Sequence, residues 1–102
     1  MKEISIIIAE SSDIMLNGIS AMLNGRPEIA VSGKANGFNA LYQLLETKTT
    51  EIVLLGPIFS QKYPAELKEE MKKTFPDIKL VEMDLKDEQD SVIEKIKKVA
   101  TI

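Results

Sequence analysis

Two acidic residues, Glu10 and Asp84, directly follow apolar stretches that are typical of buried strands. Carboxylate oxygens are ligands that a magnesium ion prefers, and one or two carboxylates usually hold the ion together with a substrate phosphate. Glu10 and Asp84 could supply two such oxygens if both side chains pointed into one crevice. The simpler interpretation, which we favour, is that both are solvated acids at strand ends.

The composition narrows the chemistry further. The 102 residues include neither histidine nor cysteine, which removes the usual acid–base group at neutral pH, thiolate nucleophiles and the commonest metal ligands. The segment Ala9-Glu10-Ser11-Ser12 lacks the glycines of a phosphate-binding loop,. An enzyme is therefore the least expected class, and we expect no catalytic residue, no metal and no cofactor. The formal net charge of -3 gives no electrostatic basis for direct binding of nucleic acid,.

Strand-like and helix-like stretches alternate along the whole chain. Apolar, β-branched runs predict strands over residues 3–9, 29–34, 51–55 and 78–83,. Ser11, Ser12 or Asp13 can cap the first helix, and Gly25 with Pro27 can stop it. The apolar faces of the four expected helices are carried by Met15, Ile19, Met22 and Leu23; by Leu41, Leu44 and Leu45; by Leu67, Met71 and Phe75; and by Val92, Ile93, Ile96 and Val99, with Asp87 as a cap for the last.

This alternation predicts a single α/β domain over residues 1–102, a doubly wound parallel sheet with helices on both faces. If the first strand is central, the strand order is 2-1-3-4, and the crevice lies between the first and third strands. Ligands of such sheets bind beyond the carboxyl ends of the strands, where the strand order reverses. The loops that begin at Glu10 and at Gly56 should meet there, with Asp84 nearby.

The segment from Gly56 to Tyr63 is longer than a typical connection between a strand and a helix, and it contains Ile58, Phe59 and Tyr63,. We favour the interpretation that these three side chains pack over the crevice and the following helix. The alternative is that they form an exposed apolar contact for a partner.

The local sequence resembles the receiver domain of bacterial response regulators, in particular the subgroup fused to a carboxyl-terminal LuxR-type helix-turn-helix. The resemblance covers nearly the whole chain and implies a flavodoxin-like fold. It rests on the strings Ile6-Ile7-Ile8-Ala9-Glu10-Ser11, Gly25-Arg26-Pro27-Glu28-Ile29, Ala35-Asn36-Gly37 and Phe75-Pro76-Asp77-Ile78-Lys79-Leu80-Val81.

The residues that would carry receiver chemistry are altered. By the resemblance, the acidic pair that holds magnesium corresponds to Glu10 and Ser11, so one carboxylate remains. The phosphate-accepting aspartate corresponds to Gly56, which cannot form an acyl phosphate, and the hydroxyl position corresponds to Asp84. No Asp or Glu lies between Glu51 and Glu66, so a small error of alignment would not restore the acceptor. The resemblance therefore predicts a vestigial phosphoacceptor pocket.

Three functions follow as expectations. The first is a non-phosphorylated receiver-like domain of a two-component response regulator that regulates transcription through protein contacts. The others are a small-ligand or metal sensor using Glu10, Ser11 and Asp84, and a stand-alone adaptor or dimerisation module. We expect a protein partner or a homodimer, contact with DNA only through another domain, and no membrane, because Met1-Lys2-Glu3 runs directly into a short apolar stretch,. The expected location is the cytoplasm.

A receiver has a fifth strand and helix after the last elements predicted here. Without them, the strand over residues 78–83 would be an open edge with a row of unpaired backbone groups. We expect that the 102 residues are the N-terminal part of a longer protein; the alternative is that self-association covers this edge.

Overall fold

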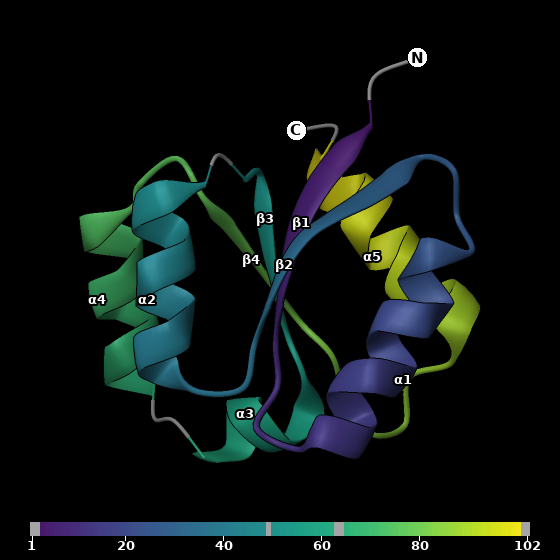
Figure 1. The fold of residues 1–102 in the computed structure, drawn as a ribbon, viewed down its shortest axis with the longest axis horizontal. Coiled ribbons are helices and arrows are strands. Elements are labelled where there is room, and N and C mark those ends of the chain that lie inside the picture. The colour runs from purple at the N-terminus through teal and green to yellow at the C-terminus, as the bar shows by residue number, and fades with distance from the viewer. Residues whose placement is uncertain (1–2, 49, 63–64, 101–102) are drawn as a thin grey trace.

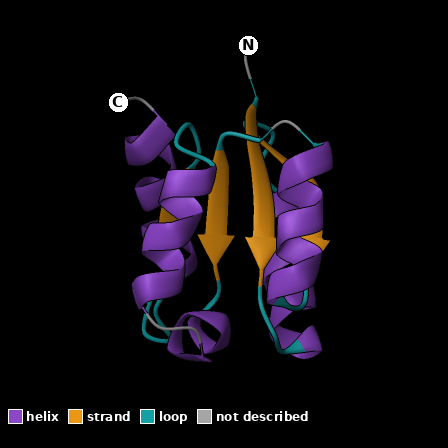
Figure 2. Ribbon diagram, turned by 90° about the vertical axis from the view of Figure 1, so that its left-hand side faces the viewer, coloured by secondary structure: helices purple, strands orange, loops and turns teal. Residues whose placement is uncertain are grey.

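The computed structural model describes residues 3–48, 50–62 and 65–100, and for Glu66 and Leu67 only the backbone. One sheet lies between two layers of helices (Figures 1 and 2). The strands are β1 (Ile4–Ala9), β2 (Ile29–Ala35), β3 (Ile52–Leu55) and β4 (Lys79–Glu82). The helices are α1 (Asp13–Asn24), α2 (Phe38–Thr47), α3 (Pro57–Lys62), α4 (Ala65–Thr74) and α5 (Gln89–Ala100).

All four strands are parallel, and their order is β2-β1-β3-β4. This confirms the predicted fold class and the predicted strand order. β1 is central and pairs with β2 on one side and β3 on the other. β4 pairs with β3 from Ile52–Lys79 to Leu55–Glu82 and forms the outer edge of the sheet within the described part of the chain.

Side chains alternate between the two faces of the sheet, because successive residues of a strand point in opposite directions. One face packs on α1 and α5, and the other packs on α2, α3 and α4. The first core contains Ile6, Ile8, Leu16, Ile19, Leu23, Ile29, Ile52, Leu54, Val81, Val92, Ile93 and Ile96. The second contains Ile7, Ala9, Ala35, Leu41, Leu45, Val53, Leu55, Phe59 and Met71.

The start of α1 follows the predicted capping chemistry. Ser12 has extended backbone angles, and its hydroxyl accepts a hydrogen bond from the N–H of Met15 at 3.4 Å. An N-cap side chain satisfies one of the first N–H groups, which have no partner inside the helix. The helix ends at Asn24, directly before Gly25, as the sequence indicates.

The segment between β3 and α4 differs from the prediction. The sequence predicts a long loop from Gly56 to Tyr63, but Pro57 begins the short helix α3. Proline is well suited to the first position of a helix, because its fixed φ fits and its missing N–H has no partner to lose there. A Gly-Pro pair is equally typical of a turn, and the prediction of a loop over this segment is wrong.

The start of α5 also differs from the prediction, since Asp87 does not cap it. The carbonyl of Glu88 accepts the first-turn bond from Val92 at 3.1 Å. Asp87 instead closes a turn with Asp84, whose N–H donates to the Asp87 carboxylate at 2.8 Å.

Helix α5 lies beside α1 on the same face of the sheet (Figure 1). Two ion pairs join α5 to the segment at the end of α1: Arg26 with Asp90 at 3.0 Å, and Lys97 with Glu28 at 3.2 Å. None of the described helices has the length and apolar character needed to cross a bilayer.

Candidate functional site

The loops that follow β1, β3 and β4 lie at the carboxyl end of the sheet, where α3 crosses below the strand ends (Figure 1). This is the end at which a doubly wound sheet binds its ligands. The backbones of the first two loops meet there, because the N–H of Gly56 donates to the carbonyl of Ala9 at 2.8 Å. The predicted site residues Glu10 and Gly56 are therefore neighbours.

Glu10 points inward and is completely buried, with 0% of its surface exposed. Its two carboxylate oxygens accept hydrogen bonds from the N–H of Ile58 at 3.1 Å and the N–H of Phe59 at 2.8 Å. The favoured expectation of a solvated acid at the strand end is therefore wrong for Glu10. We could not predict this burial, because the two donors lie 48 and 49 residues further along the chain.

These bonds complete the first turn of α3. Pro57 has no N–H, Glu10 binds the next two N–H groups, and the N–H of Ser60 donates to the carbonyl of Gly56 at 2.9 Å. A negative charge is also favourable at a helix N-terminus, where the N–H dipoles point outward. Glu10 thus does what an N-cap side chain at Gly56 would do.

The absence of a side chain at Gly56 leaves room for this arrangement. A Cβ added to Gly56 would lie 2.9 Å from the Cβ of Glu10 and still closer to the Glu10 carboxylate. Carbon atoms in contact are normally about 3.5–4.0 Å apart. No glycine among the described residues has a positive φ, so the backbone does not demand glycine here. Glycine is needed at this position because the side chain of Glu10 occupies the space that a Cβ would take.

Ser11 and Asp84 differ from Glu10 and Gly56 in their exposure. Ser11 is half-buried after β1. Asp84 is exposed, as the favoured interpretation predicts for this residue, and its carboxylate accepts a hydrogen bond from the N–H of Lys86 at 3.2 Å. The four residues that the resemblance places in one pocket are thus a buried pair, a half-buried serine and an exposed aspartate.

A magnesium ion of the receiver kind does not fit this arrangement. Both oxygens of Glu10 are engaged by backbone N–H groups, and Gly56 offers no ligand. Within residues 3–48, 50–62 and 65–100, no three acidic, histidine or cysteine side chains are grouped closely enough to hold a metal ion.

The three residues considered as a partner contact differ in burial. Phe59 is buried, with 2% exposed, and packs in the second core. Ile58, one residue earlier in α3, remains 38% exposed. Tyr63 lies outside the described residues. The packing interpretation is therefore confirmed for Phe59, whereas Ile58 remains accessible.

A hollow of about 440 Å³ lies beyond the ends of β3 and β4, next to the buried pair. Its lining is formed by Pro57, Ser60, Gln61, Glu82, Met83, Asp84, Leu85 and Lys95. Of these, only Asp84 is a candidate site residue in the sequence. Neither periodicity nor a motif marks the others, which come together from α3, the end of β4, the following loop and α5.

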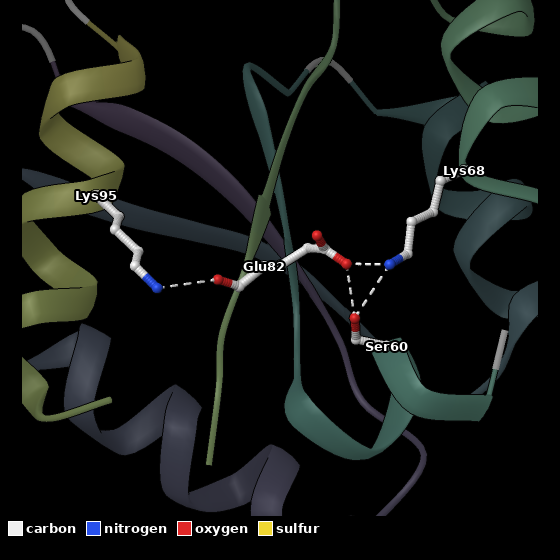
Figure 3. A network of polar contacts seen from close by, with 4 residues as sticks. All are labelled: Ser60, Lys68, Glu82 and Lys95. Carbon is white, nitrogen blue, oxygen red and sulfur yellow. Dashed lines mark hydrogen bonds and ion pairs between the residues drawn. The ribbon is translucent and has the colours of Figure 1, made fainter. Parts of the chain in front are cut away.

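Beside this hollow, Glu82 at the end of β4 is the centre of a polar network (Figure 3). Its carboxylate binds the ammonium group of Lys68 and accepts a hydrogen bond from the Ser60 hydroxyl at 2.7 Å. These hydrogen bonds hold the pKa of Glu82 below its usual range, and the bond from Lys68 has the larger effect. On the other side of β4, Lys95 forms an ion pair with Asp87 at 2.6 Å, and its hydrogen bond holds the pKa of Asp87 below its usual range.

The sheet order and the placement of the helices define the class of fold: it is that of response-regulator receiver domains. Solved structures of the response regulator RcsB carry this comparison. One is RcsB from Salmonella enterica serovar Typhimurium bound to promoter rprA in the presence of phosphomimetic BeF3-. It is 14% identical to this chain with a TM-score of 0.84. The match covers 98% of this chain and 61% of the RcsB chain.

Two structures of the receiver domain alone are also similar. The isolated domain of RcsB from Salmonella enterica serovar Typhimurium, with the same phosphomimetic, is 19% identical with a TM-score of 0.71, over 97% of this chain and 73% of that chain. The non-phosphorylated receiver domain of the stress response regulator RcsB from Escherichia coli is also 19% identical with a TM-score of 0.71. That match covers 97% of this chain and 77% of the E. coli chain.

No protein-family model matches the sequence, and no curated protein matches it. At these identities the structural likeness establishes the fold. This chain also spans less than two thirds of the RcsB chain bound to promoter DNA.

Proposed function

We propose that this chain is a receiver-like regulatory domain that acts through protein contacts and is not switched by an aspartyl phosphate. One observation carries the proposal: the Glu10 carboxylate fills the space beside Gly56 and is held there by two backbone N–H groups. A phosphoryl group needs an acceptor oxygen and positive charge around it. At this position the chain offers no acceptor and a buried carboxylate.

A role in transcription is part of this proposal. One neighbouring structure shows two RcsB dimers bound to two parallel DNAs. The net charge of -3 does not favour DNA binding by the chain itself,. We infer that a separate domain contacts DNA. The receiver-like domain described here would influence that contact through a protein surface.

The proposal is tested by incubating the chain with magnesium and a small phosphodonor such as acetyl phosphate, and in parallel with beryllofluoride. The isolated receiver domain of RcsB, which was solved with that phosphomimetic, is the matched control. We expect an unchanged intact mass and unchanged amide spectra for this chain under conditions that alter those of the control. A mass gain of one phosphoryl group, or amide shifts around Glu10 and Gly56, would overturn the proposal.

A sensor of small ligands is the other candidate, and the hollow beside β4 is the observation that favours it. Two of its polar side chains are already engaged, because Ser60 donates to Glu82 and the neighbouring Lys68 donates to Ser60. Thermal-shift measurements with divalent ions and metabolites decide the matter. No change in melting temperature is expected.

A further inference from the structure

The outer edge of β4 presents backbone groups that the sheet does not use. The N–H groups of Lys79 and Met83 donate to carbonyls on the β3 side at 3.0 and 2.9 Å. Because the direction of these groups alternates along a strand, the N–H and C=O groups of Leu80 and Glu82 point away from β3. The Glu82 carbonyl confirms this direction, since Lys95 approaches it from α5 at 3.5 Å.

The direction of winding restricts which segment can pair with this edge. The connection from β3 to β4 runs through α3 and α4, on the face opposite α1 and α5. A right-handed crossover from β4 to a strand at its outer side would need its helix on that same face. Helix α5 lies on the other face. A parallel strand reached directly from α5 would therefore need a left-handed crossover, which is very rare.

Lysine side chains flank this edge on both faces of the sheet. Lys68 binds Glu82 from α4, and Lys72, one turn later, contributes to the low pKa of the same carboxylate. From β4 itself, Lys79 reaches the last turn of α5 and donates to the carbonyl of Val99 at 3.0 Å. Figure 3 shows Lys68 and Lys95 on opposite sides of the strand.

The positive charge of these lysines favours some partners for the β4 edge over others. Glu82 pairs with Lys68 and Asp87 pairs with Lys95. Lys72 and Lys79 add two further positive charges beside this edge. In a pair of β4 edges from two copies, the lysines of each α4 would face those of the other, and like charges in close contact are unfavourable. An acidic segment would meet the lysines on both faces.

We propose that the outer edge of β4 binds an extended, acidic segment of a partner protein by strand addition. The segment would exchange backbone hydrogen bonds with Leu80 and Glu82, and its carboxylates would lie beside Lys68, Lys72 and Lys95. Main-chain hydrogen bonds supply affinity in this mode of recognition, and flanking side chains supply specificity. The inference rests on the proposed function in that it specifies the protein contact.

The test uses the full chain and a short blocked peptide that repeats two glutamates followed by two valines. Because successive side chains of a strand point to opposite faces, this peptide presents carboxylates on both faces. Binding is followed by calorimetry and by amide hydrogen exchange. We expect the peptide to bind and to protect the amides of Leu80 and Glu82, with little change at α1. Two control peptides isolate the causes: one with lysine in place of glutamate, and one N-methylated at its central amides. Each should bind at least about tenfold more weakly, since the first loses the charge complementarity and the second loses several hydrogen bonds.

Two variants of the protein test the same contacts. Lys72→Glu should weaken binding of the acidic peptide severalfold. Lys34→Glu, the same charge change at an exposed position of β2 on the opposite edge of the sheet, should not. Leu80→Pro removes an outward N–H without removing a hydrogen bond to β3. In this variant the peptide should no longer protect the Glu82 amide from hydrogen exchange. Its circular dichroism spectrum should remain that of a folded protein. If this variant does not fold, the N-methylated peptide still tests the hydrogen bonds.

Three results would overturn the inference. One is that the acidic peptide does not bind, and another is that the N-methylated peptide binds equally well. The third is that sedimentation shows a dimer of the chain alone in which the amides of Leu80 and Glu82 are protected, because a second copy then occupies the edge. The phosphodonor experiment is independent of all three, so a failure here leaves the lack of aspartyl phosphorylation to be judged separately.

Discussion

The carboxylate of Glu10 occupies the space in which a side chain at Gly56 would begin. A Cβ on Gly56 would lie 2.9 Å from that of Glu10, and the Glu10 carboxylate is fixed by the N–H groups of Ile58 and Phe59. The two residues are 46 positions apart in the sequence, yet each determines what the other can be. A side chain at position 56 and the capping glutamate at position 10 therefore compete for the same space.

Gly56→Ala should therefore destabilise the protein through Glu10. We expect a loss of about 1–3 kcal/mol in the free energy of unfolding, because an added methyl group in a packed site forces its neighbours to move. In a Glu10→Gly background the same change should cost much less, because both the carboxylate and the Cβ of Glu10 are gone. Urea denaturation of the two single variants and the double variant measures this coupling. Additive effects would contradict the steric relationship.

Glu10→Gln should weaken the start of α3. An amide has one acceptor oxygen, so Ile58 or Phe59 loses its hydrogen-bond partner and a buried N–H is left unsatisfied. We expect a loss of about 1–3 kcal/mol and faster hydrogen exchange at those two amides. Glu46→Gln, an exposed position on α2, is the matched control and should change neither. Unchanged exchange in Glu10→Gln would show that the cap is not needed.

Much of this fold can be predicted from the sequence because it depends on local pattern. The apolar runs at Ile6-Ile7-Ile8 and Ile52-Val53-Leu54-Leu55 indicate strands buried on both faces, and all four strands lie where the sequence places them, within one or two residues. The strand order is confirmed as well, since few topologies are compatible with right-handed crossovers and a central first strand.

The site could be predicted only in part, because its contacts join distant parts of the chain. Glu10 and Gly56 are both candidate site residues in the sequence, but a strand-end acid such as Glu10 is expected to be solvated. The burial of Glu10 depends on α3, and α3 was missed because Gly56-Pro57 is equally typical of a turn. The network of Ser60, Lys68 and Glu82 has no local signature, since its members are 8 to 22 positions apart.

Phe59 and Ile58, adjacent in α3, should respond differently to truncation. Phe59→Ala removes a buried ring from the second core and should cost about 3–5 kcal/mol. Ile58→Ala removes a side chain that is 38% exposed and should cost less than about 1.5 kcal/mol. Thermal and urea denaturation of both variants check this order. Equal costs would mean that Ile58 is as buried in solution as Phe59.

The stability of the protein should fall in acid partly because of Glu82. The hydrogen bonds from Lys68 and Ser60 hold its pKa below the ordinary value of 4.5. The unfolded chain therefore binds a proton at higher pH than the folded chain does. This contribution is fully present above about pH 4.5 and is lost as the pH falls through the lower pKa of the folded state. The half-exposed Glu82 should account for no more than about 1 kcal/mol, because solvent screens such pairs.

Urea denaturation between pH 7 and pH 3 measures this effect, with Glu82→Gln as the comparison. The variant should be slightly less stable than the natural chain at pH 7, and the difference should shrink as the pH falls. A residual dependence should remain in the variant, because Asp87, held below its ordinary pKa by Lys95, titrates in the same direction. Raising the ionic strength should reduce the difference at pH 7. A difference that is constant with pH would show that Glu82 stabilises the chain by packing and not by charge.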